Sequence, residues 1–507
     1  MRLQTSQPLP PSAARVLRPA APALVAGAWG FVSAAAFPRG PVTGTGVLVA
    51  MVSAGVLGWV AGFLARSRWA IVVAPLAFAA CYELGRLDVV GPSVDRPRLD
   101  TAIGVLVIVL GRGFGAVTQL LPLALGAAYG AGAARRRHPE TADPPSRLRT
   151  VLRRSRRGVA ALTVVALAVL GAVLLQPGTT APIVDAAGAP VPGSVAELAR
   201  VRLGGHEQTV LIRARDVRRP VLLYLAGGPG QSDLGYTRAY MPSLEDDTVF
   251  AVWDQRGTGT SYAALDPHRS WTLDRAVADT IELSEYLRDR FGRTRIYLFG
   301  NSWGSIIGTL AVQRRPDLYA AYIGAGQMVD PRETDRAIYA EMRALAARTG
   351  DTSRAQRLQE AGPPPYRDVY RYVEQILAYD DIGPYPKTDW FENHGPTGID
   401  GNGAGEYGPL DKVNKLKALF DMGAVMYPQI QDVDFRRDVP SLDAPVYLVE
   451  GAHELPARLT PAQEWFAALD APDKQWITFE ASGHIPQFEE YERFRALLGE
   501  IVRRHGA

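Results

Sequence analysis

The chain has 507 residues, which is enough for two or three domains, and it carries a formal net charge of +3. Its single cysteine, Cys81, excludes an intrachain disulfide and a cysteine-rich metal site. The charge is divided unevenly: residues 1–158 hold 19 arginines, no lysine and six acidic residues, a net charge of +13, and residues 159–507 therefore carry −10. The arginines stand between long apolar runs, and this pattern favours membrane topology over nucleic-acid binding.

Five apolar runs occupy the N-terminal third of the chain. They cover residues 20–37, 44–65, 69–84, 102–132 and 158–175. A helix needs about 20 apolar residues to cross the hydrocarbon core, so the second run is long enough and the first and third are marginal. Buried helices of a soluble domain are the alternative, but the runs lack a polar face. We therefore predict an all-α transmembrane region over residues 1–176.

The loop between the fourth and fifth runs predicts the orientation. It holds nine arginines, at positions 135, 136, 137, 147, 149, 153, 154, 156 and 157. Arginine-rich loops stay in the cytoplasm, so the fifth run is expected to deliver the rest of the chain to the outer side of the plasma membrane. The outcome is the same if the fourth run is a hairpin, or if residues 153–176 alone act as a signal anchor.

Arg112 interrupts the fourth run between Gly111 and Gly113. A charge inside a membrane segment can mark a functional site, but we interpret Arg112 as the point where this run bends. The apolar runs show no paired charges, which argues against a transport component. The membrane region is therefore predicted to be an anchor.

The sequence pattern changes after residue 176. Residues 177–194 are rich in Pro, Gly, Thr and Ala and are predicted to be a linker. Over residues 195–507 buried strands alternate with helices, which implies a mostly parallel sheet with helices on both faces and a site at the carboxyl ends of its strands. The strands are predicted at residues 195–203, 208–213, 220–225, 248–253, 295–299, 318–325, 446–450 and 476–479.

Residues 331–440 interrupt this alternation. Helices are predicted there at residues 332–349, 353–361, 366–380 and 411–425. Because the segment is inserted between two strands of the sheet, we expect a helical cap over the site. The cap is rich in aromatic residues, most of which are expected to form its own core.

A G-x-S-x-G sequence at residues 300–304 follows the predicted strand 295–299 and precedes an apolar, helix-compatible stretch at 305–312. Strand, glycine-flanked turn and helix are the context in which a serine is lifted off the end of a sheet as a nucleophile. The turn leaves no room for side chains at Gly300 and Gly304. Ser302 is therefore the candidate nucleophile.

A serine hydroxyl needs a base within hydrogen-bond reach, and the base needs an orienting acid. His484 is the candidate base and Glu454 the candidate acid, each on a loop after a predicted strand. The alternatives are His453 for the base and Glu450 or Asp443 for the acid.

Stabilising the oxyanion takes two backbone donors. Trp303 N–H is expected to be one, and the second is expected from the glycine turn at residues 227–228, where the backbone can approach a substrate closely. Arg256 is expected to brace the surrounding loops by pairing with Asp254 or another carboxylate.

Four motifs stand in one order: Ala-Gly-Gly-Pro-Gly at 226–230, Asp-Gln-Arg-Gly-Thr-Gly-Thr-Ser at 254–261, Gly-Asn-Ser-Trp-Gly at 300–304 and Ser-Gly-His at 482–484. In these motifs residues 195–507 resemble the proline iminopeptidase-like group of α/β-hydrolases. The resemblance implies an α/β-hydrolase core with an inserted helical cap. By position it implies Ser302 as nucleophile, His484 as base, and Gly228 with Trp303 as oxyanion donors.

Two positions depart from the pattern of that group. Ala226 stands where histidine is usual, and Glu454 stands where aspartate is usual. Glutamate can act as the acid in this fold, although its extra methylene requires a shifted backbone. Both departures weaken the inference of substrate specificity from this group more than they weaken the inference of the catalytic triad.

The expected function is a membrane-anchored serine hydrolase that cleaves an amide or ester through an acyl-enzyme without cofactor or metal. A proline iminopeptidase-like aminopeptidase competes with a carboxylesterase or lipase-type enzyme, and a non-catalytic binding or sensor protein is the alternative of another class. The expected partners are a small-molecule, peptide or ester substrate and the lipid bilayer, with no nucleic acid; the oligomeric state stays open. An aminopeptidase must hold a free amine, and the candidate carboxylates for this are Asp380, Asp381, Glu392 and Glu406.

Overall fold

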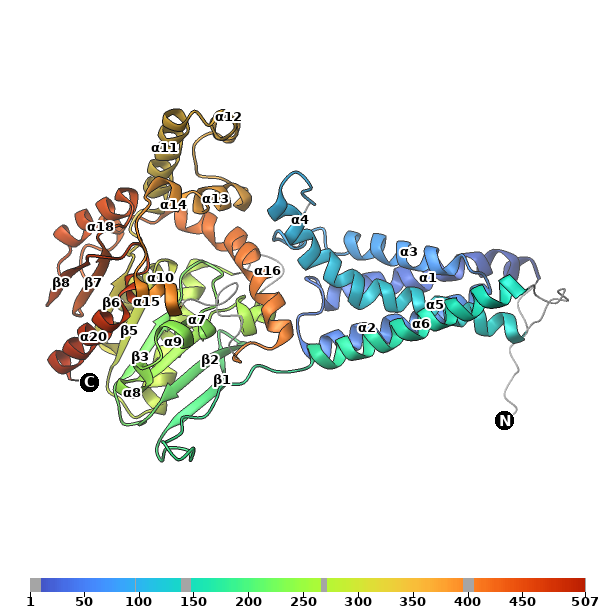
Figure 1. Cartoon of the computed structure of the whole chain (residues 1–507), viewed down its shortest axis with the longest axis horizontal. Coiled ribbons are helices and arrows are strands. Elements are labelled where there is room, and N and C mark those ends of the chain that lie inside the picture. The colour runs from blue at the N-terminus through green and yellow to red at the C-terminus, as the bar shows by residue number, and fades with distance from the viewer. Residues whose placement is uncertain (1–10, 96, 138–146, 266–270, 395–404, 507) are drawn as a thin grey trace, which may run out of the picture. The chain divides into compact units, whose positions relative to one another are not determined.

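The computed structural model describes residues 11–95, 97–137, 147–265, 271–394 and 405–506 (Figure 1). The chain separates into two compact units. The helical unit consists of Met1–Val89 and Ser93–Gln176, and the sheet-containing unit consists of Val90–Pro92 and Pro177–Ala507.

The helical unit packs apolar helices at close range. Its helices are α1 (Pro11–Ala36), α2 (Gly44–Ala65), α3 (Ala70–Leu84), α4 (Ala102–Ile108), α5 (Leu121–Arg137) and α6 (Arg147–Leu174), with the π-helical turns η1 (Val109–Gly113) and η2 (Ala116–Leu120) between α4 and α5. A Cβ atom at Gly62 of α2 would lie 2.1 Å from the carbonyl oxygen of Ala127 in α5, and one at Gly130 would lie 1.9 Å from that of Trp59. Small residues let two such helices touch along their backbones.

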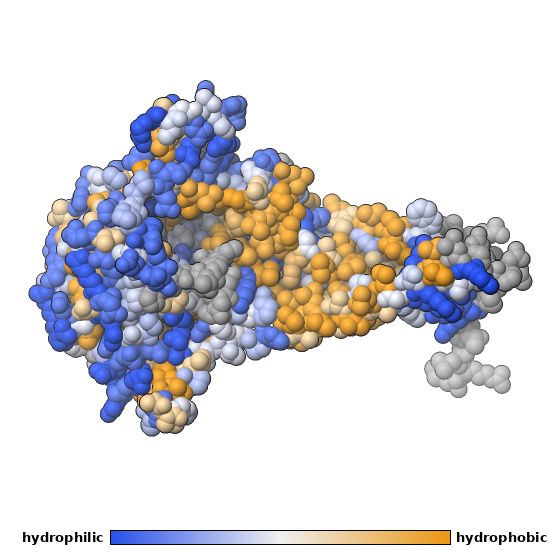
Figure 2. Space-filling view, in the orientation of Figure 1, coloured by the Kyte–Doolittle hydropathy of each residue, from blue (hydrophilic) through white to orange (hydrophobic). Residues whose placement is uncertain are grey.

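Three stretches of this unit are long and apolar enough to span a membrane, namely Gly44–Ala65, Ala102–Arg137 and Thr150–Leu174. Two shorter apolar helices, Ala20–Ala36 and Ala70–Leu84, correspond to the two runs that the sequence marks as marginal. Large apolar side chains of these helices point outward, and Figure 2 shows the hydrophobic surface that they form. All five predicted apolar runs are therefore helical.

The interpretation of Arg112 needs a correction. The helix is irregular there, since Arg112 lies in η1, and a Cβ atom at Gly111 would lie 2.1 Å from the carbonyl oxygen of Ser93. Arg112 also donates from Nε and Nη2 to the carboxylate of Glu83, at 3.1 and 3.0 Å. Both residues belong to predicted apolar runs, so the expectation that these runs hold no paired charges is wrong. The partners are far apart in sequence and only the packing of the helices brings them together.

The second unit is built on one eight-stranded sheet with the order β1-β2-β4-β3-β5-β6-β7-β8. The strands are β1 (Val195–Leu203), β2 (His206–Ala214), β3 (Val221–Leu225), β4 (Val249–Asp254), β5 (Ile296–Asn301), β6 (Tyr319–Ala325), β7 (Val446–Gly451) and β8 (Lys474–Phe479). The pairs β1–β2 and β2–β4 are antiparallel and the other pairs are parallel. Each predicted strand is present, with bounds shifted by up to two residues, and Gly204 and Gly205 form the predicted turn at positive φ.

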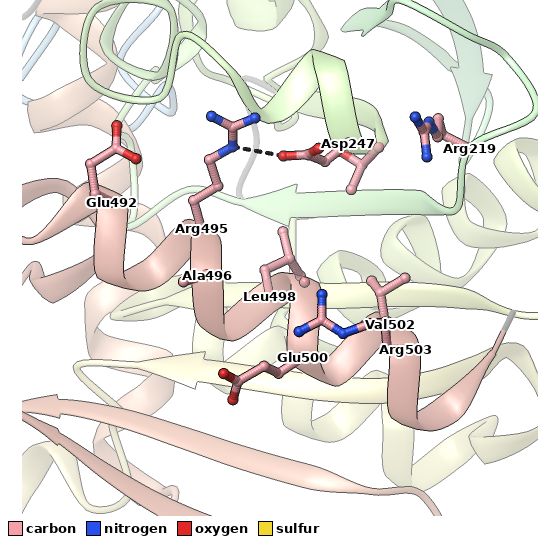
Figure 3. A pocket seen from close by; sticks show the side chains of 11 residues that line it. Arg219, Asp247, Glu492, Arg495, Ala496, Leu498, Glu500, Val502 and Arg503 are labelled. Atoms are coloured by element: carbon pink, nitrogen blue, oxygen red, sulfur yellow. Dashed lines mark hydrogen bonds and ion pairs between the residues drawn. The ribbon is translucent and has the colours of Figure 1, made fainter.

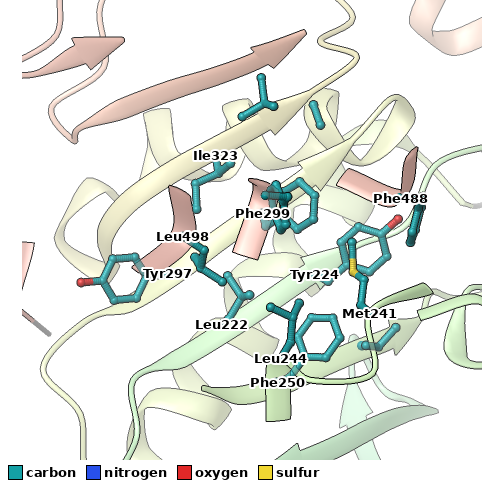
Figure 4. Packing of buried hydrophobic residues seen from close by; sticks show 14 of the residues in the cluster. Leu222, Tyr224, Met241, Leu244, Phe250, Tyr297, Phe299, Ile323, Phe488 and Leu498 are labelled. Carbon is teal, nitrogen blue, oxygen red and sulfur yellow. The ribbon is translucent and has the colours of Figure 1, made fainter. Parts of the chain in front are cut away.

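Helices cover both faces of the sheet because side chains alternate between the faces along each strand. Leu222 and Tyr224 of β3 point to one face, where they form a buried cluster with residues of α7 (Leu234–Tyr240), α8 (Leu244–Asp247) and α20 (Tyr491–His505) (Figure 4). Leu225 points to the opposite face and contacts α10 (Trp303–Arg314) at Gly308. The helix α9 (Leu273–Arg290) packs against α10.

The inserted segment between β6 and β7 is helical, as the sequence predicts. It contains α11 (Pro331–Thr349), α12 (Thr352–Ala361), α13 (Val369–Ile376), α14 (Tyr379–Ile382), α15 (Asp389–His394), α16 (Pro409–Met426), η6 (Tyr427–Asp432) and α17 (Phe435–Asp438). The expectation for its aromatic residues is correct for Tyr366 and Tyr372, whose rings pack against each other within the segment, with centroids 5.1 Å apart. Trp390 and Phe391 pack instead against the core of the sheet. The short helices α7, α8 and α15 were not predicted, because four to seven residues carry too little periodicity.

Candidate active site

The turn between β5 and α10 holds Ser302 in an unusual conformation. Its φ and ψ are 52° and −119°, and Arg66 is the only other described non-glycine residue with positive φ. A Cβ atom at Gly304 would lie 2.1 Å from the carbonyl oxygen of Leu225, and one at Gly300 would lie 2.5 Å from that of Gly304. The glycines are therefore required by space, as the sequence predicts, and the strained serine projects from the end of β5.

His484 and Glu454 lie together at the same edge of the sheet. Glu454 follows β7, His484 follows β8, and His484 Nδ1 makes a short hydrogen bond with Glu454 Oε2. The other oxygen, Oε1, accepts from the backbone N–H of Leu455 at 2.7 Å and from Arg458 Nη1 at 3.4 Å. Because both oxygens of the carboxylate are hydrogen-bonded, Glu454 is held in place beside the imidazole.

The environment of Glu454 keeps it ionised. Burial opposes its charge, but the attraction of His484 and Arg458 and the hydrogen bonds outweigh this and lower the pKa of Glu454 to about 2. An ionised carboxylate only accepts hydrogen bonds, so the shared hydrogen is carried by Nδ1. The Nε2 atom of the neutral imidazole is then left with the lone pair that a general base requires.

The alternative residues lie elsewhere. Glu450 is buried in β7, where it accepts from the backbone N–H of Gln327 at 2.8 Å, and burial together with the charge of Glu454 raises its pKa to about 8. Asp443 is exposed before the start of β7, at the opposite end of that strand. His453 is exposed and stacks on Tyr385 with ring centroids 4.9 Å apart. Within the described part of the chain, none of the three is hydrogen-bonded to the His484 side chain.

Ser302 and His484 both lie against the segment at the end of β6, where Ser302 N–H donates to the carbonyl oxygen of Ala325 at 3.0 Å. Asn301 Nδ2 donates to the carbonyl oxygens of Ala325 (3.0 Å) and His484 (3.5 Å), and the His484 ring packs against Gly326. Within the described residues Ser302 Oγ pairs with Met328 Sδ at 3.7 Å rather than with His484. Such contacts often tighten only when substrate binds.

The glycine turn after β3 faces Ser302. A Cβ atom at Gly227 would lie 3.4 Å from that of Ser302, and Gly228 has a φ of 117°. Trp303 begins α10, and the N–H groups of a first helical turn have no partner inside the helix. The expected donors Gly228 and Trp303 therefore lie on the two segments that flank the serine.

Gln255 links these two segments and was missed in the sequence. Its Oε1 accepts from Trp303 Nε1 at 2.8 Å, and its Nε2 donates to the carbonyl oxygen of Ala226 at 3.2 Å. The signal was available, because Gln255 lies in the motif 254–261. Arg256 was expected to pair with Asp254 or another carboxylate, and it pairs with Asp279 of α9 at 3.0 Å.

Comparison with known proteins agrees with this arrangement. Residues 220–491 match the alpha/beta hydrolase fold family. The chain belongs to this family. It is 29% identical over 319 residues to a probable aminopeptidase, YbaC, of Bacillus subtilis (strain 168), which covers 62% of this chain and 98% of that protein. It is 23% identical over 301 residues to a proline iminopeptidase of Clostridium botulinum, which covers 57% and 91%.

The solved structures that this chain resembles include the proline iminopeptidase of Mycobacterium smegmatis. The match has a TM-score of 0.40 and 20% identity, and it covers 61% of this chain and 98% of that one. Both the fold predicted from the sequence and the proline iminopeptidase-like relatives are thus confirmed.

Among the described residues of this hydrolase, no recorded contact joins the four candidate amine-binding carboxylates to Ser302. Asp380, Asp381 and Glu392 are exposed. Glu406 is buried, but it accepts from Thr180 Oγ1 at 3.0 Å and lies 3.3 Å from Arg238 Nε.

Glu489 of α19 (Pro486–Glu489) is a buried carboxylate that the sequence analysis missed. Its Oε2 accepts from the backbone N–H of Gly483, next to His484, at 2.7 Å. Its Oε1 accepts from Tyr385 OH of the inserted segment at 2.7 Å and lies 3.5 Å from Lys387 Nζ. Glu489 therefore ties the loop of His484 to the cap of the hydrolase.

A cavity of about 540 Å³ lies along α20, apart from these residues (Figure 3). Arg495 donates there to Asp247 at 2.6 Å, and Arg219, Glu492 and Arg503 also line the cavity. Because its lining mixes both charges and includes none of the candidate catalytic residues, it does not belong to the site. No group of three or more His, Cys, Asp or Glu side chains in the described residues is arranged to hold a metal ion.

Proposed function

We propose that this protein is a membrane-anchored serine hydrolase that cleaves an amide or ester through an acyl-enzyme and acts as a proline iminopeptidase-like aminopeptidase. The observation that carries the proposal is the strained Ser302 at the end of β5, beside the hydrogen-bonded pair of His484 and Glu454. The peptidase names of the relatives support the amide branch. The apolar helices of the first unit support the membrane anchor, and its arginine-rich loop supports an outward-facing hydrolase domain.

In the proposed mechanism Ser302 Oγ attacks the carbonyl carbon while His484 Nε2 accepts its proton. Glu454 stabilises the imidazolium that forms. The backbone N–H groups of Gly228 and Trp303 stabilise the negative charge on the carbonyl oxygen. His484 then protonates the leaving amine or alcohol, and a water molecule deprotonated by the same histidine hydrolyses the acyl-enzyme.

Ester hydrolysis is the second candidate function. It is favoured by the exposure of Asp380, Asp381 and Glu392, since an aminopeptidase needs a carboxylate that faces the substrate amine.

A fluorophosphonate probe on the full-length protein tests the proposal. We expect labelling of the wild type and none of Ser302→Ala, because only an activated serine reacts. An unlabelled wild type would favour a non-catalytic binding protein. Wild-type enzyme that has not been treated with the probe should then be assayed on aminoacyl amides and on short and long acyl esters; turnover of esters alone would exclude the peptidase.

Protease treatment of intact cells tests on which side of the membrane the hydrolase domain lies. Protease added to intact cells should remove the hydrolase domain while the membrane helices stay protected. Full protection of the domain would contradict the proposed outward placement.

A further inference from the structure

The helical unit contains a cavity of about 770 Å³ that is rich in arginine. The arginines that line it are Arg68, Arg135, Arg136, Arg153, Arg156 and Arg157. Among the described residues that line the cavity none is acidic, and none of the six forms an ion pair with another described residue. The lining therefore carries a concentrated positive charge that no described side chain neutralises.

The spacing of these residues along α5 and α6 places them on one face of each helix. In α6, Arg153, Arg156, Arg157 and Ala160 follow one another at i, i+3, i+4 and i+7, which is one face of a helix. Arg154 does not fall on this face of the helix and does not line the cavity. A second stripe comes from α5 and consists of Ala128, Gly132, Arg135 and Arg136, at i, i+4, i+7 and i+8, which is also one face of a helix.

Apolar and aromatic residues lie beside the arginines. Ile71 and Leu152 line the cavity, and so does Tyr129, which is 42% exposed. Trp69, directly after Arg68, is 74% exposed. Tyrosine and tryptophan concentrate at the level of the lipid headgroups, so the cavity combines basic side chains with the features of a membrane interface.

We propose that this cavity binds the headgroup of an anionic phospholipid. Guanidinium groups pair with phosphate through two parallel hydrogen bonds, and a bound phosphate relieves the mutual repulsion of the six charges. Ile71 and Leu152 offer an apolar path for the acyl chains. Basic pockets between membrane helices on the cytoplasmic side suit such headgroups, and the inference rests on the membrane placement proposed above.

A matched pair of triple variants tests the site in the full-length protein. Arg68→Gln, Arg136→Gln and Arg156→Gln remove one cavity arginine from each of three segments. The control, Arg66→Gln, Arg137→Gln and Arg154→Gln, removes the same charge from the same segments outside the cavity. Binding of cardiolipin and phosphatidylglycerol is measured against phosphatidylcholine by lipid titration of the detergent-solubilised protein.

We expect the wild type and the control to prefer the anionic lipids, and the cavity variant to lose affinity for them on the order of 100-fold. Equal losses in both variants would overturn the proposal, because diffuse charge would then explain the preference. Inorganic phosphate binding as tightly as the lipids would overturn it in favour of a soluble anion.

Two measurements on the same samples separate this inference from the proposals on which it rests. Failure of the wild type to float with phosphatidylcholine vesicles would refute the membrane placement. Flotation without a preference for anionic lipid would refute the lipid site alone. Equal helix content by circular dichroism and equal elution in gel filtration for wild type and variants report that the variants are folded.

Discussion

At the scale of single residues, two neighbouring glutamates have surroundings that shift their pKa values in opposite directions. Glu454 and Glu450 lie four positions apart, yet the pKa of one falls to about 2 and that of the other rises to about 8. Burial raises the pKa of both carboxyl groups. Glu454 is hydrogen-bonded to His484 and Arg458, which offsets this cost, whereas Glu450 accepts only from the backbone N–H of Gln327 among the described contacts.

Glu454→Gln is predicted to lower kcat by about 10²- to 10⁴-fold, because the amide can hold His484 in the wrong tautomer. The measurement is kcat and KM on whichever substrate the assays identify. Glu464→Gln, an exposed position in α18 (Pro456–Ala468), serves as the control and should leave kcat unchanged. A loss of less than tenfold would assign the orienting role to another acid.

Glu450→Gln is predicted to stabilise the protein increasingly as the pH rises from about 4.5 to 8. In this window the folded wild type holds a proton on Glu450 that the unfolded chain has released, so its stability falls with pH. Glutamine keeps an acceptor for Gln327 N–H and does not titrate. The Tm difference between variant and wild type at pH 5 and at pH 8 measures this; a constant difference would show that Glu450 is already ionised.

At the scale of elements, one of the connections between the inserted segment and the candidate site runs through Tyr385. Tyr385 stacks on His453, donates to Glu489 of α19, and lies against Gly483, where a Cβ atom would be 2.3 Å from its hydroxyl oxygen. The backbone N–H of Gly483 donates to the same carboxylate. The position of the cap is thereby coupled to the loop that carries His484.

Tyr385→Phe is predicted to raise KM several-fold with little change in Tm, because it removes one hydrogen bond between cap and site and keeps the ring. Tyr366→Phe is the matched control, since its hydroxyl donates to Gly362 within the cap at 2.8 Å. This control also removes one hydrogen bond and keeps the ring, so it should change Tm by a similarly small amount and leave KM unchanged. Equal KM values for both variants would show that Tyr385 does not position the cap.

At the scale of the whole molecule, the chain consists of two units, and every candidate catalytic residue belongs to the second. A fragment of residues 177–507 is therefore predicted to react with the fluorophosphonate probe and to keep the kcat of the full-length protein on small water-soluble substrates. Its Ser302→Ala form controls for non-specific reaction. Loss of labelling in a fragment that is folded by circular dichroism would show that the helical unit contributes to the site.

Local patterns were sufficient for most elements of the fold. Strand bounds, the turn at Gly204 and Gly205, the elbow at Ser302 and the five apolar helices all depend on residues adjacent in the chain. The short helices and the exact ends were less predictable, since few residues define them.

The sequence by itself determined the fold class, the helical character of the N-terminal third and the strand–serine–helix turn, because periodicity and glycine spacing act over a few residues. Only the tertiary structure decided which polar groups meet. Arg112 pairs with Glu83 across 29 positions, Arg256 with Asp279 across 23 and Tyr385 with Glu489 across 104. Such pairs depend on the packing of whole elements, and a charged residue has no local signal for the partner that packing will bring to it.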